Sequence, residues 1–209
     1  SERSRGLGDV YKRQVPNYNK IKFEINKLLN SEQKNAVEKI NVSIKKKKPD
    51  CFLLDGVPGS GKTETYFQTV KTCLDEGKQI LILLPEISLT PDWEKRFYQT
   101  FSFAPLVWHS GITNTKKKQI WLSALNGSAG VVVGARSALM LPISNLGLII
   151  VDEEHEPAFK QEEGVRYNAR DMAIYKAIRS SAPIVLASAT PSLETCLLYT
   201  SPSPRDLSE

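Results

Sequence analysis

Four residues near the start of the chain are spaced for binding phosphate. Gly56, Gly61, Lys62 and Thr63 form the pattern G-x-x-x-x-G-K-T, between an apolar run and a stretch with helical spacing. In that setting the glycines let successive N–H groups face one anion, and the helix adds its positive end. Lys62 would neutralise the β- and γ-phosphates, and the Thr63 hydroxyl would ligate magnesium. The pattern therefore predicts binding of a nucleoside triphosphate, with an ordinary glycine-rich turn as the alternative.

A pair of acids follows a later apolar run. Asp152 and Glu153 stand directly after a predicted buried strand, where a carboxylate can hold Mg²⁺ opposite a phosphate loop. We expect Asp152 to hold the ion through water, and Glu153 to orient and deprotonate the attacking water. An acidic surface turn is the alternative. A metal site made of Glu154, His155 and Glu156 is disfavoured, because adjacent residues do not easily converge on one ion.

Two small hydroxyl residues follow the last apolar run. Ser188 and Thr190 flank Ala189 directly after residues 184–187. Hydroxyls at the end of a strand suit a switch that senses phosphate or the acidic cluster described above. The same three residues also make a plausible turn, so their spacing alone leaves both interpretations open.

The elements that must position these residues alternate between helix and strand. Helical spacing is predicted over residues 31–44, 62 to about 75, 91 to about 100, 114–126 and 168–179. Apolar runs predict strands at 51–54, 79–84, 106–108, 129–133, 146–151 and 184–187. Short apolar strands that alternate with helices indicate a parallel sheet covered on both faces. We therefore predict a three-layer α/β fold with a mainly parallel sheet, whose ligands bind at the carboxyl ends of the strands.

A few residues define the expected faces and ends of the helices. Ile120, Trp121 and Leu125 are predicted to point inward from the helix at 114–126. Gly77 is predicted as the C-cap of the helix that follows the phosphate loop. Thr90 is predicted as an N-cap, because a proline follows it at the first helical position.

The positive charge of the chain is concentrated at its start. The net charge is +5, but residues 1–48 carry 13 Lys/Arg and 5 Asp/Glu, whereas residues 49–209 carry 15 and 18. The predicted phosphate-loop domain is therefore not basic, and charge alone is weak support for nucleic-acid binding. The lysines at 45–48 are interpreted as a solvated linker, with a phosphate contact as the alternative.

Composition also limits the cellular setting. No run of 18 apolar residues exists and no signal peptide is recognised, so we expect no contact with a membrane. The three cysteines, Cys51, Cys73 and Cys196, are far apart and form no C-x-x-C pair. This pattern argues against a disulfide framework or a zinc site in this stretch, and favours a reducing, cytoplasmic location.

The chain divides into a core and two ends that fit no pattern in it. Residues 1–14 and 196–209 are interpreted as non-native tails that resemble adapter sequence read through as protein, with a genuine disordered tail as the alternative. Residues 15–30 are interpreted as a linker that precedes this core. The predicted domain comprises residues 31–195.

Together the motifs resemble one family of motor proteins. The stretches GVPGSGKTETY, PEISLTPDW, HSGITNTKKKQIW, VVVGARSALMLP, LIIVDEEHEPAFKQEEGVRYNARDMA and LASATPSLET are similar to those of the replication-restart DNA helicases of superfamily 2. The likeness runs from about residue 28 to 195, and the stretch after D-E-E-H is its most specific part. It implies the first RecA-like, P-loop lobe of an ATP-dependent 3′-to-5′ DNA helicase that uses ATP and Mg²⁺.

The resemblance implies roles for the residues of the nucleotide site. Gln33 matches the glutamine that reads the adenine edge, and Asp152 and Glu153 match the catalytic acids. The ATP-binding residues implied by the family are Gln33, Gly56, Gly59, Ser60, Gly61, Lys62, Thr63 and Glu64, with Lys62 also catalytic. Pro58 stands where a threonine is commoner, which we regard as conservative because this position offers mainly backbone.

The resemblance also implies a DNA-binding face and residues that couple it to hydrolysis. The DNA contacts implied are Glu86, Ser88, Thr90, Arg136 and Ser137, and the coupling residues are His155, Ser188, Thr190 and Arg170. Arginine and hydroxyl groups would contact phosphates, which position a strand without reading its sequence. Residues 159–170 would form the coupling loop, although its two aromatic residues, Phe159 and Tyr167, could instead be packing residues. For His109 a structural role is favoured.

The family implies parts that these residues do not contain. They are a second lobe with an arginine finger, zinc-binding cysteines downstream, and an upstream DNA-binding region that recognises forks, from which residues 15–30 would be the linker. We expect this chain alone to bind ATP weakly, to hydrolyse it very slowly and not to unwind DNA, since an arginine finger contributes about 10³–10⁵ in rate. Expected partners are single-stranded and forked DNA, primosome proteins and single-strand-binding protein. Another superfamily 2 translocase, or a non-catalytic single-lobe nucleotide- or DNA-binding module, remains the alternative; a small-molecule kinase would leave D-E-E-H unexplained.

Overall fold

The described part of the chain forms a three-layer α/β domain in this computed structural model, which describes residues 23, 29–161 and 167–191. The helices are α2 (Ser31–Lys46), α3 (Lys62–Asp75), α4 (Pro91–Phe101), α5 (Asn114–Leu125) and α6 (Ala169–Ser180), with three 3₁₀ turns, η2 (Glu86–Ser88), η3 (Arg136–Met140) and η4 (Pro157–Phe159). The strands are β1 (Cys51–Asp55), β2 (Gln79–Leu83), β3 (Leu106–Trp108), β4 (Val131–Gly134), β5 (Leu146–Asp152), β6 (Lys160–Gln161), β7 (Tyr167–Asn168) and β8 (Ile184–Ser188).

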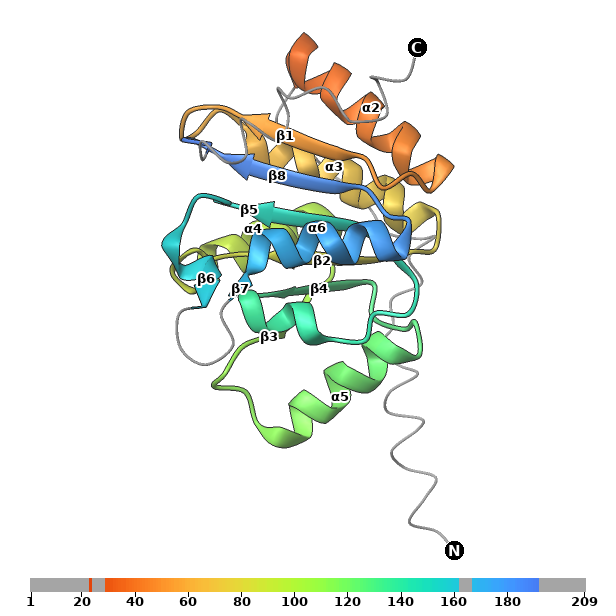
Figure 1. Ribbon diagram of the computed structural model, residues 1–209, viewed down its shortest axis with the longest axis vertical. Helices are drawn as coiled ribbons and strands as arrows, with labels where there is room; N and C mark the ends of the chain where they lie inside the picture. The colour runs from red at the N-terminus through yellow and green to blue at the C-terminus, as the bar shows by residue number, and fades with distance from the viewer. Residues whose placement is uncertain (1–22, 24–28, 162–166, 192–209) are drawn as a thin grey trace, which may run out of the picture.

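Six strands form one parallel sheet in the order β1-β8-β5-β2-β4-β3, and β6 and β7 pair separately. The predicted α/β fold with a mainly parallel sheet is therefore confirmed. The strands all run the same way, so every loop that leaves a carboxyl end lies along one edge, on the left in Figure 1. Along that edge, the loop after β8 lies between those after β1 and β5, and the loops after β2 and β4 are neighbours.

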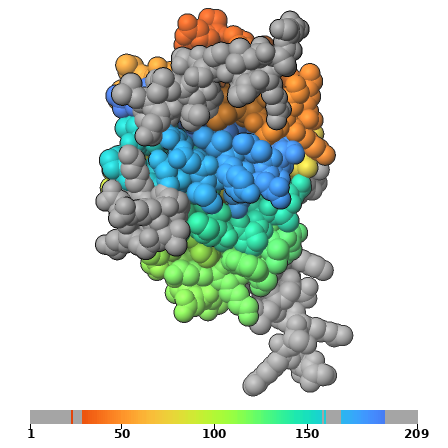
Figure 2. All heavy atoms as spheres, viewed as in Figure 1, coloured from red at the N-terminus to blue at the C-terminus, as the bar shows by residue number. Residues whose placement is uncertain are grey.

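Alternate residues of each strand serve two separate cores. Ile80 and Ile82 pack with α2, α3 and α4, whereas Leu81 and Leu83 pack with α5 and α6. This alternation follows from the pleat of a strand, which turns successive side chains to opposite faces. Figure 1 shows α6 crossing in front of the sheet with α3 and α4 behind it, and Figure 2 shows α6 covering the middle of the near face.

The predicted elements are all present, with ends that differ by one or two residues. The third helical prediction, capped by Thr90, is confirmed, since the Thr90 hydroxyl accepts a hydrogen bond from Trp93 N at 3.3 Å. β4 begins at Val131 rather than at residue 129. The C-cap of α3 is Glu76, one residue earlier than the predicted Gly77, and Gly77 follows it with φ of +66°.

The predicted inward face of α5 is partly wrong. Ile120 is buried, but Trp121 is 43% exposed and Leu125 is 46% exposed. Ser123 and Ala124 take their place in the interface. The physical reason is the position of α5 beside β3, an edge strand of three residues, which offers only a narrow surface to the helix.

Sequence reasoning missed the three 3₁₀ turns and the short β6–β7 pair. These segments are only two to five residues long, which is too short for a hydrophobic period to show. Two of the turns, η2 and η3, leave the carboxyl ends of β2 and β4 and thus shape the edge where ligands are expected.

Candidate functional site

The phosphate-loop residues form an anion cradle between β1 and α3. Gly59 and Gly61 have φ of +78° and +90°, which glycine adopts without strain. Gly61 is the N-cap of α3 and offers no side-chain oxygen to the first N–H groups of the helix. A Cβ on Gly61 would lie 2.8 Å from Gln33 Nε2, so glycine also allows the close approach of α2. The geometry leaves the positive end of α3 available to an anion.

The Lys62 side chain reaches back to the backbone of the phosphate loop. Its Nζ donates to Gly56 O at 2.5 Å and to Val57 O at 3.4 Å. Both acceptors are backbone carbonyls of the same loop, so the ammonium group is held where a phosphate would arrive. An open pocket of about 380 Å³ adjoins it, lined by residues that include Gln33, Gly56, Ser60 and Lys62.

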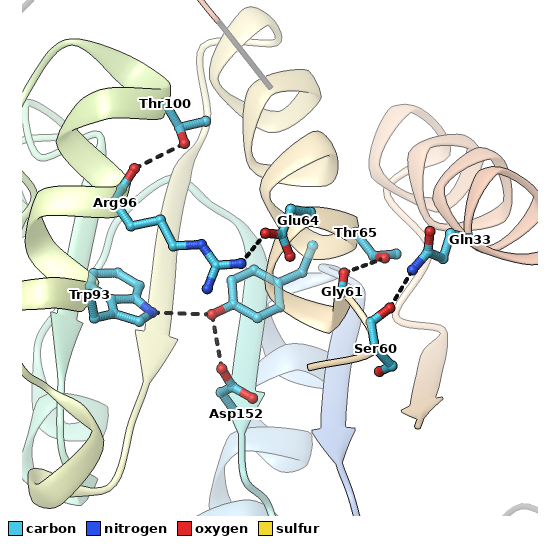
Figure 3. Close-up of polar contacts among 10 residues, drawn as sticks. Gln33, Ser60, Gly61, Glu64, Thr65, Trp93, Arg96, Thr100 and Asp152 are labelled. Atoms are coloured by element: carbon cyan, nitrogen blue, oxygen red, sulfur yellow. Dashed lines mark hydrogen bonds and ion pairs between the residues drawn. The ribbon is translucent and has the colours of Figure 1, made fainter. Parts of the chain in front are cut away.

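Gln33 docks α2 onto the phosphate loop. Its Nε2 donates to Ser60 O at 2.7 Å, and its Oε1 accepts from Asn30 N at 2.9 Å. The Asn30 side chain in turn accepts from Gln33 N, which completes a capping box at the start of α2. Gln33 was expected to read the adenine edge; in the structure its amide nitrogen contacts Ser60 of the phosphate loop (Figure 3), and its amide oxygen contacts Asn30 N.

Asp152 ends β5 as a buried carboxylate held at both oxygens. The residue is 8% exposed; its Oδ2 accepts from the Tyr66 hydroxyl at 2.9 Å and its Oδ1 from Glu153 N at 3.1 Å. Burial raises the pKa of the Asp152 carboxyl above its ordinary value, and the hydrogen bond from Tyr66 acts against this rise. Figure 3 shows Asp152 facing the hydroxyl that Trp93 reaches from the other side.

Glu153 follows in an unusual backbone conformation. Its φ is +52°, in the left-handed region that non-glycine residues seldom adopt and that often marks functional sites. Its side chain is 36% exposed, and its Oε2 lies 3.7 Å from His155 Nδ1. The turn therefore separates the buried carboxylate of Asp152 from a second, accessible carboxylate one residue later.

Ser188 connects the acidic turn with the phosphate loop. Its hydroxyl lies 2.7 Å from His155 Nδ1 and accepts a hydrogen bond from Thr190 N at 3.2 Å. Its carbonyl accepts from Gly56 N at 3.2 Å. Because β8 lies between β1 and β5, this residue touches both neighbours. The structure thus brings His155, Ser188 and Thr190 together with the loop.

Arg170 lies apart from that group. It is buried in the first turn of α6, where its Nη1 lies 3.5 Å from Glu154 Oε2 and its Nη2 lies 2.9 Å from Asp171 Oδ1. Glu154, which sequence reasoning treated only as a disfavoured metal ligand, is also buried and faces this arginine. Within the described residues no cluster of three or more His, Cys, Asp or Glu is placed to hold a metal ion.

Glu64 faces α4 from the first turn of α3. Its Oε1 forms an ion pair with Arg96 (Figure 3), and its Oε2 is buried with no hydrogen-bond partner among the described residues. The predicted nucleotide residue is therefore engaged with a residue that the sequence did not single out.

The residues predicted to face DNA lie on two neighbouring turns. Glu86 and Ser88 belong to η2 after β2, and Arg136 and Ser137 begin η3 after β4, the strand paired with β2. A pocket of about 290 Å³ between the two turns is lined by residues that include Ile87 and Arg136. Thr90 stands at the start of α4 as its N-cap. The structure thus groups these residues on what we call the outer half of the carboxyl edge, where the loops after β2 and β4 lie.

The remaining predicted residues have structural positions. Phe159 is buried in the core, in keeping with the packing interpretation, while the side chain of Tyr167 lies outside the described residues. His109 Nδ1 accepts from Gly111 N at 3.2 Å, which closes a short turn. Lys45 and Lys46 form the last turn of α2, where positive charge stabilises a helix end.

Three residues of the site were missed by sequence reasoning: Tyr66, Trp93 and Arg96. Tyr66 lies three positions after Thr63, on the same side of a helix, which is the one signal that could have placed it near the magnesium ligands. Trp93 and Arg96 are 27 and 32 residues away from their partners Tyr66 and Glu64, and no local pattern reports such contacts.

The residues fit Mg²⁺ bound together with a nucleotide. This ion is usually held by one or two carboxylates and the phosphates of the substrate, rather than by a cage of protein ligands. Asp152 supplies a buried carboxylate with both oxygens oriented, and Thr63 stands in the first turn of α3. These two residues would hold the ion.

Comparisons with known proteins agree with this geometry. A profile of the DEAD/DEAH box helicases matches residues 30–197. The chain is 49% identical over 167 residues to "Replication restart protein PriA" of Rickettsia felis, and 46% identical over 167 residues to that of Bacillus subtilis. Each match covers 80% of this chain but only 25% and 21% of the relative, so the chain spans about a quarter of their length.

A solved structure supports the fold in the same way. RecG bound to a three-way DNA junction matches with a TM-score of 0.60 and 24% identity, covering 91% of this chain and 26% of that chain. At this identity the match concerns the fold alone, and it agrees with the predicted RecA-like lobe. Among the described helices, none is both long and apolar enough to cross a membrane.

Proposed function

Because the chain belongs to the DEAD/DEAH box helicase family, we propose that it is the first motor lobe of an ATP-dependent 3′-to-5′ DNA helicase. Its substrate would be a stalled or branched replication fork, and its role replication restart and primosome assembly. The relatives named for replication restart, at 46–49% identity, support this assignment. The observation that carries it is the convergence of the phosphate loop, Asp152 and the hydroxyl of Ser188 at three adjacent strand ends.

The nucleotide half of the site suits a phosphoryl-transfer reaction. Magnesium, when bound with ATP, would neutralise charge that develops on the phosphates. The N–H groups at the start of α3 would bind the phosphates. The Lys62 ammonium group would leave the Gly56 carbonyl and bind the phosphates too. Asp152 and Thr63 would hold the ion, while Gln33 would contact the adenine edge. Glu153, one residue after Asp152 and partly exposed, would accept the proton of the attacking water.

The link between hydrolysis and nucleic acid would run through Ser188. Its hydroxyl contacts His155 and its carbonyl contacts the phosphate loop, so a change at either loop displaces a shared residue. Thr190 and Arg170 are the further coupling residues that we propose. Arg170 would act at a distance, by holding the turn that contains Glu154.

The outer half of the edge would carry single-stranded DNA. Glu86, Ser88, Arg136 and Ser137 lie on the turns η2 and η3, which follow β2 and β4, and Thr90 is the N-cap of α4. Arginine and hydroxyl side chains would contact backbone phosphates, which gives affinity without sequence preference. The acidic Glu86 would orient the strand rather than attract it.

The complete protein would contain more than this lobe. We propose a second lobe that closes the ATP cleft, a zinc-binding region, primosome proteins and single-strand-binding protein as partners, and a cytoplasmic location. The ATP turnover rate of the 209-residue chain alone would be about 10³–10⁵-fold lower than that of the whole motor, because the second lobe supplies the arginine finger.

The test is to sequence the source gene outward past both ends and to assay its full-length product. We expect a reading frame that continues into paired cysteines and a second lobe, and ATP hydrolysis stimulated by single-stranded and forked DNA. Stimulation by duplex DNA alone would indicate another superfamily 2 translocase. ATP binding without turnover in the full-length product would indicate a single-lobe binding module instead.

A further inference from the structure

A buried chain of hydrogen bonds joins the start of α4 to the end of β5. The Thr90 hydroxyl accepts from Trp93 N at 3.3 Å, and Trp93 Nε1 donates to the Tyr66 hydroxyl at 3.3 Å. The Tyr66 hydroxyl donates to Asp152 Oδ2 at 2.9 Å. An indole N–H can only donate and a carboxylate can only accept. The two bonds of the Tyr66 hydroxyl therefore have a fixed direction: it accepts from Trp93 and donates to Asp152.

The tyrosine hydroxyl stands out from its surroundings. Tyr66 is fully buried, and its ring lies 5.3 Å from that of Phe67 in a cluster of aromatic side chains. Trp93 packs against Phe67 and Phe97 in the same cluster. Phenylalanine would fill this site equally well, so packing alone does not account for the hydroxyl. The rigid cluster instead holds the hydroxyl in one place.

The consequence falls on Asp152. With Oδ2 bound by Tyr66 and Oδ1 bound by Glu153 N, the plane of the carboxylate is set before any ion arrives. Partners that orient a metal ligand change metal affinity although they do not touch the metal.

We propose that Tyr66 is a positioning residue for the magnesium-holding carboxylate, and that Trp93 fixes the tyrosine hydroxyl for this task. This inference rests on the proposed function, since it assumes that Asp152 holds Mg²⁺ together with ATP. It adds a route from α4, whose N-cap Thr90 lies on the expected DNA-binding face, to the nucleotide site. A second contact between the same two helices, Arg96 with Glu64, keeps α4 in place beside α3.

The experiment measures ATP binding to the 209-residue chain by calorimetry over a series of Mg²⁺ concentrations. The quantity compared is the Mg²⁺ concentration that gives half of the magnesium-dependent gain in ATP affinity. In Tyr66→Phe we expect it to rise about tenfold, with ATP affinity in EDTA unchanged. In Trp93→Phe, which keeps an aromatic ring but loses the N–H donor and part of the ring volume, we expect a rise of about two- to threefold.

Tyr98→Phe is the matched control, because Tyr98 lies on α4, is 56% exposed and is not part of the hydrogen-bond chain to Asp152. Equal half-saturation in Tyr66→Phe and Tyr98→Phe would overturn the inference. So would an equal loss of ATP affinity with and without Mg²⁺ accompanied by a lower Tm, since that result shows a purely structural role. Wild-type chain that binds no ATP under any condition would instead overturn the proposed function, and this inference with it.

Discussion

The two halves of the carboxyl edge differ in how far they are organised before any ligand binds. In the nucleotide half, the loops after β1, β8 and β5 are joined by hydrogen bonds through Ser188, and Asp152 is oriented by Tyr66. In the outer half, η2 and η3 present exposed side chains such as Ile87, 77% exposed, and Met140, 60% exposed. Chemistry on a phosphate needs fixed geometry, whereas sequence-independent binding of a strand needs accessible surface.

The two faces of the sheet differ in a related way. The face covered by α2, α3 and α4 is packed with large aromatic rings, including Phe67, Phe97 and Phe101. The helix α6 on the other face is buried through Ala169, Ala173 and Ala177. The helix α3, which begins at the phosphate loop, therefore packs against aromatic rings of α4 through Phe67.

The largest expected effect follows from removing the base of the nucleotide half. In the full-length protein, Glu153→Gln should lower the ATP turnover rate by about 10²–10⁴-fold, because the amide cannot accept a proton from water. ATP binding should be kept, since Glu153 is not among the residues that line the phosphate loop. The measurement is ATPase rate together with ATP affinity by calorimetry.

Glu156→Gln is the matched control for that change, because Glu156 lies three residues further along the same turn and is not in the proposed chemistry. It should leave turnover nearly unchanged. Normal hydrolysis by Glu153→Gln would show that Glu153 is not the base. The nucleotide half would then have no assigned proton acceptor to distinguish it from the outer half.

A somewhat smaller effect is expected from the phosphate cradle. Lys62→Ala should lower turnover by about 10²–10³-fold, because it removes a charge that neutralises the transferred phosphate. Unlike Glu153→Gln, it should also weaken ATP binding, and both quantities are measured in the full-length protein. Lys71→Ala, on the same helix but in an exposed ion pair with Asp75, should change neither by more than about twofold. Equal behaviour of the two lysine variants would contradict the assignment.

The outer half should respond through nucleic-acid affinity alone. Arg136→Ala should weaken binding of single-stranded DNA by about tenfold and reduce the slope of log affinity against log salt by about 0.7, the value for one phosphate contact. ATP affinity should be unchanged, because Arg136 lies after β4, away from the phosphate loop. Fluorescence anisotropy at several salt concentrations measures both quantities.

Arg179→Ala provides the comparison, since Arg179 is exposed at the last turn of α6, at the opposite edge of the sheet. It removes the same charge without touching the expected strand. A loss of affinity equal to that of Arg136→Ala would mean that general charge, rather than the outer half of the edge, attracts DNA.

Most of the fold could be predicted from the sequence, because it is determined by local patterns. The phosphate loop, the apolar strands and the N-cap at Thr90 each depend on a few neighbouring residues, and all are present. The links between elements could not be predicted, because they join distant residues. Tyr66 and Asp152 are 86 positions apart, and Arg170 pairs with Glu154, which belongs to a different part of the sequence.

The error at α5 has another cause and can be tested by the smallest expected effect. The helical pattern suggested that Trp121 was part of the core, but a pattern cannot report how wide the surface beneath a helix is. Here the surface is one short edge strand, and Trp121 remains 43% exposed.

Trp121→Ser should therefore change the free energy of unfolding by no more than about 0.5 kcal/mol in urea denaturation. Ile120→Ala, one residue earlier and 3% exposed, should destabilise the chain by about 2–5 kcal/mol. If Trp121→Ser instead destabilised the chain by about 3–5 kcal/mol, the tryptophan would be a core residue as first predicted. The narrow surface of β3 would then not account for the packing of α5.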